Sequence, residues 1–166
     1  MKPALLVIDV QKQFFKISPA TAQSLEEAIE TINAAIEIFR EKDLPVICIQ
    51  HMDSEDKLMS GDEDFEIPDQ LDILQADFHV HKTYGNSFNK TPLEGKLREL
   101  GIDTVIVTGF CAEACVLSTV RGAEDCDFSA IILRGALAST KPENIPFVES
   151  ISSVISYGAL KTFLSA

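Results

Sequence analysis

An acid, an imidazole, an amine and a thiol each stand at or just beyond the end of a separate apolar run of this sequence. They are Asp9, His51, Lys82 and Cys115. The carboxyl ends of parallel strands meet at one edge of an open sheet, and ligands bind at that edge. If the apolar runs are strands of one sheet, the four side chains come together at a single site.

A carboxylate beside a thiol indicates nucleophilic catalysis. Asp9, partly desolvated by its strand, could act as a general base with a raised pKa. Cys115 stands where a helix is expected to begin, and a helix N-terminus lowers a thiol pKa and offers N–H groups to an oxyanion. Lys82 could hold the carboxylate and favour a thiolate. Each residue also has a purely structural interpretation, so it is their shared position that favours chemistry.

Metal chemistry is a second possibility, because three histidines and Asp53 lie near the expected strand ends. His51 is two residues from Asp53, while His79 and His81 alternate along a strand and point to one face. No third ligand follows at a tight spacing. We therefore expect neither a metal nor another cofactor.

The four cysteines are too few for a disulfide scaffold. Cys48 and Cys126 fit a packing role, whereas Cys111 and Cys115 could form a redox pair, although their spacing is not specific. No charged and then apolar leader opens the chain, and its first apolar run is far shorter than a membrane span. We expect a cytoplasmic protein with reduced thiols.

The composition and net charge exclude some classes of binding partner. Of 166 residues, 46% are hydrophobic and 24% are charged, and the net charge is −12. Such a field repels phosphate backbones and anionic lipids, so neither nucleic acid nor a membrane surface is an expected partner. The length suits one domain over residues 1–166.

Apolar runs alternate with helical patterns along the chain, which predicts a three-layer α/β/α sandwich with a mainly parallel sheet of five to six strands. The expected strands are 4–8, 45–49, 78–82, 104–108, 128–133 and a short last one at 160–164. The expected helices cover 25–39, a segment starting near 91, a segment around 116–123, and 142–155. Residues 51–75 are irregular and acidic, and form either a solvated loop or a lid or dimer contact.

The helix that starts near residue 91 has a specific signature. Thr91 can act as the cap, Pro92 suits the first helical position, and Glu94 completes a capping box. We therefore expect this helix to begin directly after Thr91.

Three segments together resemble the isochorismatase-like cysteine hydrolases, a family that includes nicotinamidases and N-carbamoylsarcosine amidases. They are LLVIDVQ at 5–11, followed by Phe14 or Phe15; KTYGNSF at 82–88, followed by Thr91 and Leu93; and VTGFCAEACV at 107–116, followed by Thr119. The segments occur in order and span nearly the whole chain, which makes their combination specific.

The resemblance implies a catalytic triad of Asp9, Lys82 and Cys115. It also implies a cis peptide bond between Phe110 and Cys111, which would turn the backbone N–H of Cys111, with that of Cys115, toward an oxyanion. By the same resemblance, a homodimer or a homotetramer is expected.

Several positions depart from the family pattern. The family often has Thr where Ala112 stands, and Asp where Glu113 or Gly135 stands. Metal-binding nicotinamidases carry Asp-x-His after the second strand, whereas this chain has the inverted order from His51 to Asp53. Members that cleave the vinyl ether of isochorismate often lack the cysteine, so its presence favours cleavage of a C–N bond.

We therefore predict a hydrolase that cleaves a small-molecule amide or carbamoyl substrate through a thioester on Cys115. Nicotinamide, ureido acids and N-carbamoyl amino acids are all open as substrates. The candidate pocket-wall residues are Gln11, Phe14, His51, Tyr84, Phe88 and Phe110. Two alternatives remain: a redox-responsive thiol protein that uses Cys111 and Cys115, and a non-catalytic oligomeric binding module on the same fold.

Overall fold

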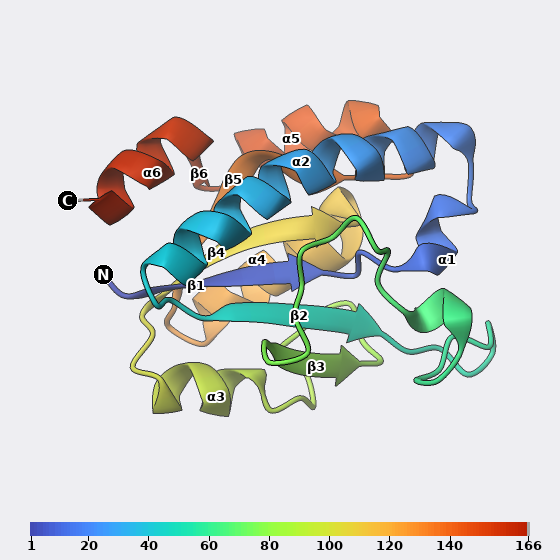
Figure 1. The fold of residues 1–166 in the computed structure, drawn as a ribbon, viewed down its shortest axis with the longest axis horizontal. Coiled ribbons are helices and arrows are strands. Elements are labelled where there is room, and N and C mark those ends of the chain that lie inside the picture. Colours follow the sequence, from blue (N-terminus) through green and yellow to red (C-terminus); the bar gives the residue numbers. More distant parts are fainter. Residues whose placement is uncertain (166) are drawn as a thin grey trace.

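Six parallel strands form one sheet in the computed structural model, which describes residues 1–165 (Figure 1). The strands are β1 (Pro3–Ile8), β2 (Val46–His51), β3 (Phe78–Lys82), β4 (Thr104–Phe110), β5 (Ser129–Ala138) and β6 (Val154–Ile155). Their order is β3-β2-β1-β4-β5-β6. The predicted α/β/α sandwich with a parallel sheet is confirmed.

The helices connect the strands and cover both faces of the sheet. The α-helices are α1 (Lys12–Phe15), α2 (Pro19–Glu41), α3 (Leu93–Glu99), α4 (Leu117–Asp125), α5 (Ile145–Ser150) and α6 (Tyr157–Ser165). Two 3-10 turns, η1 (Glu63–Phe65) and η3 (Pro142–Asn144), and one π-helix, η2 (Ala112–Val116), complete the set. None of the described helices is long and apolar enough to cross a membrane.

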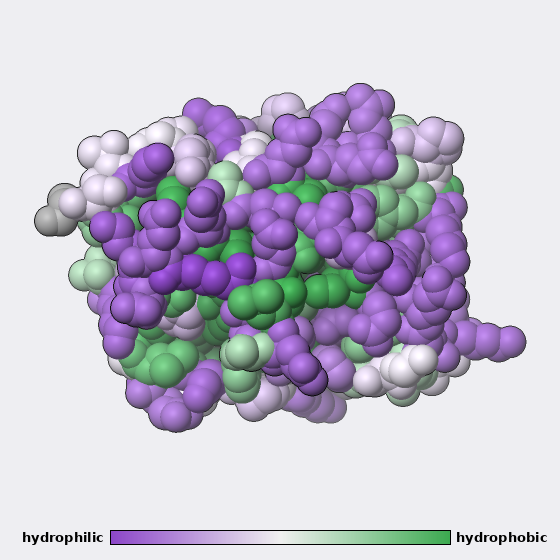
Figure 2. Space-filling view, in the orientation of Figure 1, coloured by the Kyte–Doolittle hydropathy of each residue, from purple (hydrophilic) through white to green (hydrophobic). Residues whose placement is uncertain are grey.

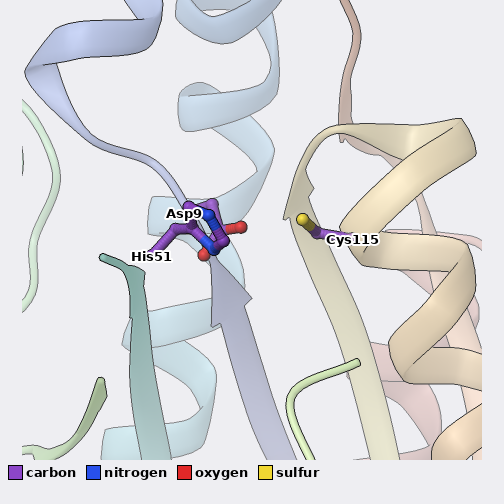
Figure 3. Close-up of side chains that lie close together, drawn as sticks. All are labelled: Asp9, His51 and Cys115. Atoms are coloured by element: carbon purple, nitrogen blue, oxygen red, sulfur yellow. The ribbon is translucent and has the colours of Figure 1, made fainter. Parts of the chain in front are cut away.

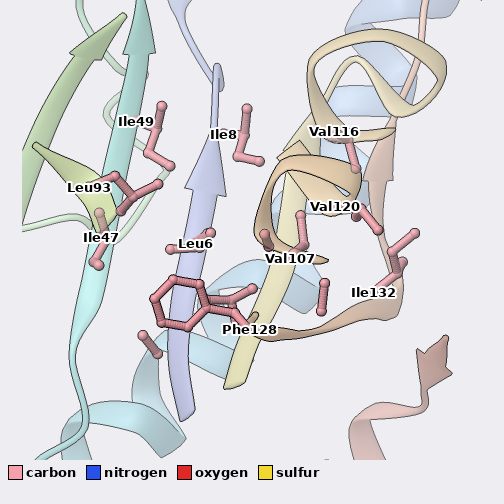
Figure 4. Close-up of a cluster of buried hydrophobic side chains, with 14 of the residues drawn as sticks. Leu6, Ile8, Ile47, Ile49, Leu93, Val107, Val116, Val120, Phe128 and Ile132 are labelled. Atoms are coloured by element: carbon pink, nitrogen blue, oxygen red, sulfur yellow. The ribbon is translucent and has the colours of Figure 1, made fainter. Parts of the chain in front are cut away.

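Strand β1 is buried at every residue, which explains why its sequence is continuously apolar. Leu6 and Ile8 face one core with the apolar sides of α3 and α4, as Figure 4 shows. Leu5 and Val7 face a second core under α2 and α6. Polar side chains cover much of the outer surface that Figure 2 shows.

The chain reverses its direction of travel across the sheet between β1 and β4. From β1 it first runs outward to β2 and β3, and then returns to add β4 on the other side of β1. A reversal of this kind opens a crevice at the carboxyl ends of the two neighbouring strands, where ligands bind. The topology therefore places the ends of β1 and β4 at the candidate site.

Gly109 allows β4 to pack closely beside β1 at this point. Its φ is +111°, and a Cβ added there would lie 2.1 Å from the backbone oxygen of Ile8. No other residue type has both the conformational freedom and the small size required. The glycine thus brings the segment after β4 against the end of β1.

The end of the chain differs from the sequence prediction. Residues 160–164 belong to helix α6, because Leu160 and Leu164 lie one turn apart and both pack into the core under α2. A short apolar run cannot be distinguished from a strand by its pattern alone. The sixth strand is β6, which lies inside the predicted helix 142–155 and pairs with β5 through Val154 and Ile132.

The predicted capping box forms only in part. Helix α3 begins at Leu93, and its N-cap is Pro92, which has no side-chain hydrogen bond. Thr91 accepts the backbone N–H of Leu93 at 3.3 Å and donates its hydroxyl to the backbone oxygen of Ser87, whereas Glu94 pairs with Arg98 on the helix surface. Thr91 thus satisfies a backbone N–H of the first turn, but Glu94 forms a helical ion pair and does not complete the box.

Candidate active site

A cavity of about 400 Å³ opens at the carboxyl ends of β2, β1, β4 and β5. Its lining comprises Asp9, Gln13, Phe14, Ile17, His51, Asp53, Asp56, Leu58, Phe110, Cys111, Ala114, Cys115 and Thr140. The cavity therefore draws on segments that are far apart in the sequence and that the parallel sheet brings together.

Asp9 lies at the centre of this edge, directly after β1. Its φ of 52° is left-handed, and its backbone N–H donates to the oxygen of Ile49 at 2.8 Å. The side chain is 1% exposed, and burial raises the pKa of the carboxyl group although the charge of Lys82 acts against the rise. Oδ1 has no hydrogen-bond partner among the described residues.

Lys82 reaches Asp9 from β3, two strands away. Its Nζ donates to Oδ2 of Asp9 at 2.9 Å and to the backbone oxygen of Tyr84 at 3.0 Å, and it lies 3.3 Å from Nδ1 of His51. An ammonium group can only donate, so Nδ1 accepts and the ring carries its proton on Nε2. Burial first, and then the charge of Lys82, lower the pKa of His51 and keep the ring neutral.

Cys115 lies in η2, the first turn after β4, and faces Asp9 and His51 across the cavity (Figure 3). One oxygen of Asp9, one ring nitrogen of His51 and Sγ of Cys115 lie within 4.8 Å of one another. The helix start does not produce a lowered thiol pKa as expected. Burial, followed by the charge of Asp9, raises the pKa of Cys115 to about 12, because both effects outweigh the nearby ammonium of Lys82.

The peptide bond between Phe110 and Cys111 is cis, as the resemblance implies. Beyond it, the thiol of Cys111 donates to Glu113 at 3.2 Å rather than pointing to Asp9. Glu113 also accepts hydrogen bonds from Ser139 at 2.6 Å and from Asn144 at 2.9 Å. Burial opposes the charge of Glu113, but these hydrogen bonds prevail and lower its pKa. Glu113 thus anchors the segment between β4 and Cys115.

The two cysteines of the C-x-x-x-C sequence have different surroundings. Both thiols are free, and Cys111 hydrogen-bonds to Glu113 and Ser139 while Cys115 faces Asp9. No hydrogen bond in the described structure points the two sulfur atoms toward each other. The structure therefore offers no specific support for a redox pair.

Three of the six predicted wall residues line the cavity. Phe14 and His51 do so, and the ring of Phe110 stacks on that of Phe14 with centroids 4.8 Å apart. The stacked pair forms an apolar wall beside the carboxyl group of Asp9.

The other three predicted wall residues do not line the cavity, which corrects the prediction. Gln11 is fully buried, and its amide bonds to the backbone of His51 and Phe65. Phe88 packs against Phe128 in the core, and Tyr84 contributes a backbone oxygen to Lys82. Gln11 and Tyr84 thus contact the residues of the site from outside the cavity, whereas Phe88 belongs to the core.

Part of the lining could not be recognised from the sequence. Gln13 and Ile17 come from the segment around α1, Thr140 follows the unexpectedly long β5, and Asp53, Asp56 and Leu58 belong to the acidic segment 51–75. The antiparallel bridge between Asp53 and Leu58 folds that segment back over the cavity. The sequence alone leaves open whether this segment is a solvated loop or a lid or dimer contact, and the bridge and the lining place part of it in the cavity wall.

One group of described residues has the donor types that a metal ion requires, namely Asp9, His51 and Cys115. However, the ammonium group of Lys82 already contacts Asp9 and His51. A cation at the same position would be repelled by this charge. His79 and His81 are exposed and lie outside this group, and His79 bonds to the backbone oxygen of Leu74.

This combination of fold and site defines a hydrolase of the isochorismatase-like type, and the chain belongs to the isochorismatase family. The family's Isochorismatase domain model matches residues 3–148. The isochorismatase family protein YddQ of Bacillus subtilis strain 168 is 30% identical over 144 residues, which cover 84% of this chain and 79% of YddQ.

Solved structures show the same relationship. An isochorismatase-like hydrolase from Alkaliphilus metalliredigens has a TM-score of 0.88 at 25% identity, with 98% of this chain and 99% of that chain covered. N-carbamoylsarcosine amidase from Thermoplasma acidophilum has a TM-score of 0.81 at 27% identity, with 95% and 97% covered. The similarity thus includes a protein named as an amidase of N-carbamoylsarcosine.

Proposed function

We propose that this protein hydrolyses a C–N bond of a small amide or carbamoyl compound through a thioester on Cys115. The observation that carries the proposal is the buried carboxyl group of Asp9, which faces the thiol on one side and is paired with Lys82 on the other. A base and a nucleophile with a third group that orients the base form the general arrangement of nucleophilic catalysis.

The proposed reaction begins with the thiol in its protonated form, because the pKa of Cys115 is raised to about 12. Asp9 takes the thiol proton as sulfur attacks the carbonyl carbon of the substrate. The carbonyl oxygen becomes an oxyanion, which we assign to the backbone N–H groups of Cys111 and Cys115. Proton transfer coupled to attack suits a carboxyl group whose pKa is raised by burial.

The attack of sulfur gives a tetrahedral intermediate, and the proton that Asp9 has taken from the thiol is used again when this intermediate breaks down. Asp9 delivers it to the leaving nitrogen, the C–N bond breaks, and the acyl group remains on Cys115 as a thioester. Asp9 then deprotonates a water molecule, which attacks the thioester. The C–S bond breaks, the acid leaves, and the thiol regains its proton. Lys82 orients Asp9 throughout and stabilises its negative charge.

Ammonia release from a panel of small primary amides tests the proposal. Wild-type protein is compared with Cys115→Ala and with Cys111→Ala, which removes the neighbouring thiol while keeping the backbone N–H. We expect Cys115→Ala to abolish turnover and Cys111→Ala to retain most of it. Mass spectrometry of the rapidly quenched wild type should find the acyl group on Cys115. Full turnover by Cys115→Ala would overturn the mechanism.

The assembly state is a separate proposal, which rests on family analogy. We propose a homodimer or a homotetramer of this chain. Sedimentation equilibrium measures the mass directly, and a mass of one chain of 18.2 kDa at micromolar concentration would overturn it.

A further inference from the structure

The charges around the cavity are of one sign. The charged residues in its lining are Asp9, Asp53 and Asp56, and no lysine or arginine of residues 1–165 is among them. Lys82 lies behind Asp9, where it is 1% exposed and its charge is paired with the carboxylate. A substrate that enters the cavity therefore meets carboxylates and no free cation.

The sheet order separates these carboxylates from the thiol. Asp53 and Asp56 belong to the loop after β2, whereas Cys115 follows β4 on the other side of β1. Asp9, after β1, lies between them. A substrate whose carbonyl carbon is held at Cys115 thus directs the rest of its structure into a space bounded on the β2 side by Asp53 and Asp56.

Asp53 is held in place by its own loop. Its Oδ1 accepts the backbone N–H groups of Glu55 at 2.9 Å and of Asp56 at 3.4 Å, and its backbone pairs with Leu58 in both directions. This turn fixes the direction of the side chain, so its charge cannot simply swing away from an incoming anion.

Much of the remaining wall is apolar, although Gln13 and Thr140 add uncharged polar groups. Phe14 and Phe110 stack on each other, and Ile17, Leu58 and Ala114 continue this surface. Ile17 is 52% exposed, which places an apolar side chain at the mouth of the cavity. Such a surface accommodates an uncharged or flat substrate body without requiring a polar partner.

Asp9 favours a substrate that has an N–H group next to the carbonyl carbon that Cys115 attacks. Its Oδ2 is occupied by Lys82, and the buried Oδ1 has no donor within hydrogen-bond distance among the described residues, although the thiol of Cys115 faces the carboxyl group and acts on its pKa as a hydrogen-bond partner. Figure 3 shows one carboxylate oxygen turned toward Cys115. A buried acceptor without a donor is unfavourable, and the N–H group of a substrate amide at Cys115 would satisfy it.

We infer that the substrate is a small primary amide or carbamoyl compound whose remaining part is neutral or positively charged, and that carboxylate-bearing amides are rejected by Asp53 and Asp56. The inference rests on the proposed function and narrows it. It separates this chain from an enzyme for N-carbamoylsarcosine, whose amino-acid part carries a carboxylate. Asp53 is half-buried and Asp56 is exposed, so water screens the two carboxylates only in part and they repel a substrate carboxylate that enters the cavity.

A matched set of amides tests the inference. Butyramide, β-alaninamide and succinamate share a short carboxamide chain that ends in a methyl, an ammonium or a carboxylate group. Benzamide, 4-(aminomethyl)benzamide and 4-carbamoylbenzoate repeat the comparison on a ring. We expect kcat/KM for each anion to be at least about tenfold below that of its neutral partner, and the cation to equal or exceed the neutral amide. An anion hydrolysed as well as its neutral partner would overturn the inference.

Two double variants show whether the lining carboxylates cause the effect. Asp53→Asn with Asp56→Asn removes their charge and keeps an oxygen for the turn, and we expect it to raise the relative rate of the anions about tenfold. Glu55→Gln with Glu63→Gln removes the same charge from exposed positions of the same segment that do not line the cavity. An equal effect of both double variants would show a general field and overturn the assignment to Asp53 and Asp56.

The rate at which charged reagents modify Cys115 measures the effect of the same carboxylates without any amide turnover. 2-(Trimethylammonio)ethyl and 2-sulfonatoethyl methanethiosulfonate each form a mixed disulfide with a cysteine thiolate and release methanesulfinate. Peptide mass spectrometry gives the rate at Cys115, and free cysteine gives the reference ratio. We expect the cation to react at least about tenfold faster than the anion, relative to that reference, and the Asp53→Asn, Asp56→Asn variant to reduce the difference.

The two tests separate the possible failures. If no amide is hydrolysed but the reagents show the charge preference at Cys115, the proposed function fails and the electrostatic assignment of the cavity stands. If neutral amides are hydrolysed and neither test shows a preference against anions, the hydrolase proposal stands and the inference on substrate class is wrong.

Discussion

Nζ of Lys82 lies 2.9 Å from Oδ2 of Asp9, and both side chains are almost completely shielded from solvent. The pair joins the edge strand β3 to the central strand β1 across β2. Removing one partner of a buried ion pair leaves the other charge without compensation, and this is more unfavourable than removing both. The pair therefore links the stability of the fold to the state of the proposed base.

Replacement of Lys82 should show this link. We expect Lys82→Met to reduce the free energy of unfolding by about 3–5 kcal/mol, and the double variant Asp9→Asn, Lys82→Met to recover most of the loss. Urea denaturation followed by circular dichroism measures both values. Additive losses in the double variant would contradict the interpretation of the pair as one unit.

We expect the protonation of Asp9 to set the acid limb of the proposed activity. Burial raises its pKa above the ordinary value, and the proposed reaction requires the carboxylate form. We therefore expect kcat/KM to fall as the pH falls through this raised pKa. We expect Asp9→Asn to reduce kcat about 10²–10⁴-fold at all pH values.

The same carboxyl group affects stability with the opposite sign. The folded protein holds the Asp9 proton more tightly than the unfolded chain does, so this contribution is complete below the unfolded pKa of 3.8 and is lost as the pH rises through the folded value. Denaturant titrations of wild type and Asp9→Asn across this range isolate the contribution. A wild-type stability that rises relative to Asp9→Asn over the same interval would contradict the raised pKa.

The charge of Asp9 also holds the Cys115 thiol in its protonated form. Because this charge is one cause of the pKa of about 12, Asp9→Asn should lower the thiol pKa while it reduces turnover. Thiolate absorbance near 240 nm during an alkaline titration measures the change, with Cys115→Ala as the blank. An unchanged titration in Asp9→Asn would show that burial alone controls the thiol.

Glu113 should position the segment that carries Cys111. It accepts hydrogen bonds from Ser139, Asn144 and the thiol of Cys111. Glu113→Gln replaces one acceptor oxygen by a donor, so we expect a loss of about 1–3 kcal/mol of stability. We also expect kcat to fall with little change in KM. Glu143→Gln, a nearby acid with no described hydrogen bond, serves as the control, and an equal loss there would contradict the role of Glu113.

Gly109 and Gly95 form a matched pair for testing the approach of β4 to β1. Alanine at Gly109 would place a Cβ 2.1 Å from Ile8 in a left-handed conformation, so we expect Gly109→Ala to unfold the protein or to disorder the cavity. Gly95 lies in α3 with no atom within 4 Å of an added Cβ, and Gly95→Ala should stabilise by about 0.5–1 kcal/mol. Thermal unfolding of the soluble fraction compares the two variants.

The sheet was predictable because its central strands are buried on both faces and are therefore continuously apolar. The edge-forming element β6 was not, because two residues at the end of a helical pattern carry little signal and Val154 becomes a strand only through pairing with Ile132. Similarly, Leu160 lies in a short apolar run whose helical form is decided by packing under α2.

The candidate site also has residues whose position could be predicted from the sequence and residues whose position could not. Asp9, Lys82 and Cys115 come together because parallel strands end at one edge, and strand ends can be located in a sequence. The role of Asp53 depends on a bridge to Leu58, and the inward burial of Gln11 depends on backbone groups of His51 and Phe65. Contacts of this kind between distant loops leave no periodic pattern.

The reach of Lys82 across β2 makes an edge strand part of the proposed catalytic apparatus. β3 pairs only with β2 in the sheet, and edge elements separate from a fold more readily than central ones. If β3 detaches, the ammonium group leaves with it, and Asp9 remains in an apolar environment that favours its protonated form. We therefore expect heat or denaturant to inactivate the enzyme while β1 and β4 are still paired. Loss of turnover should then precede unfolding of the rest of the protein.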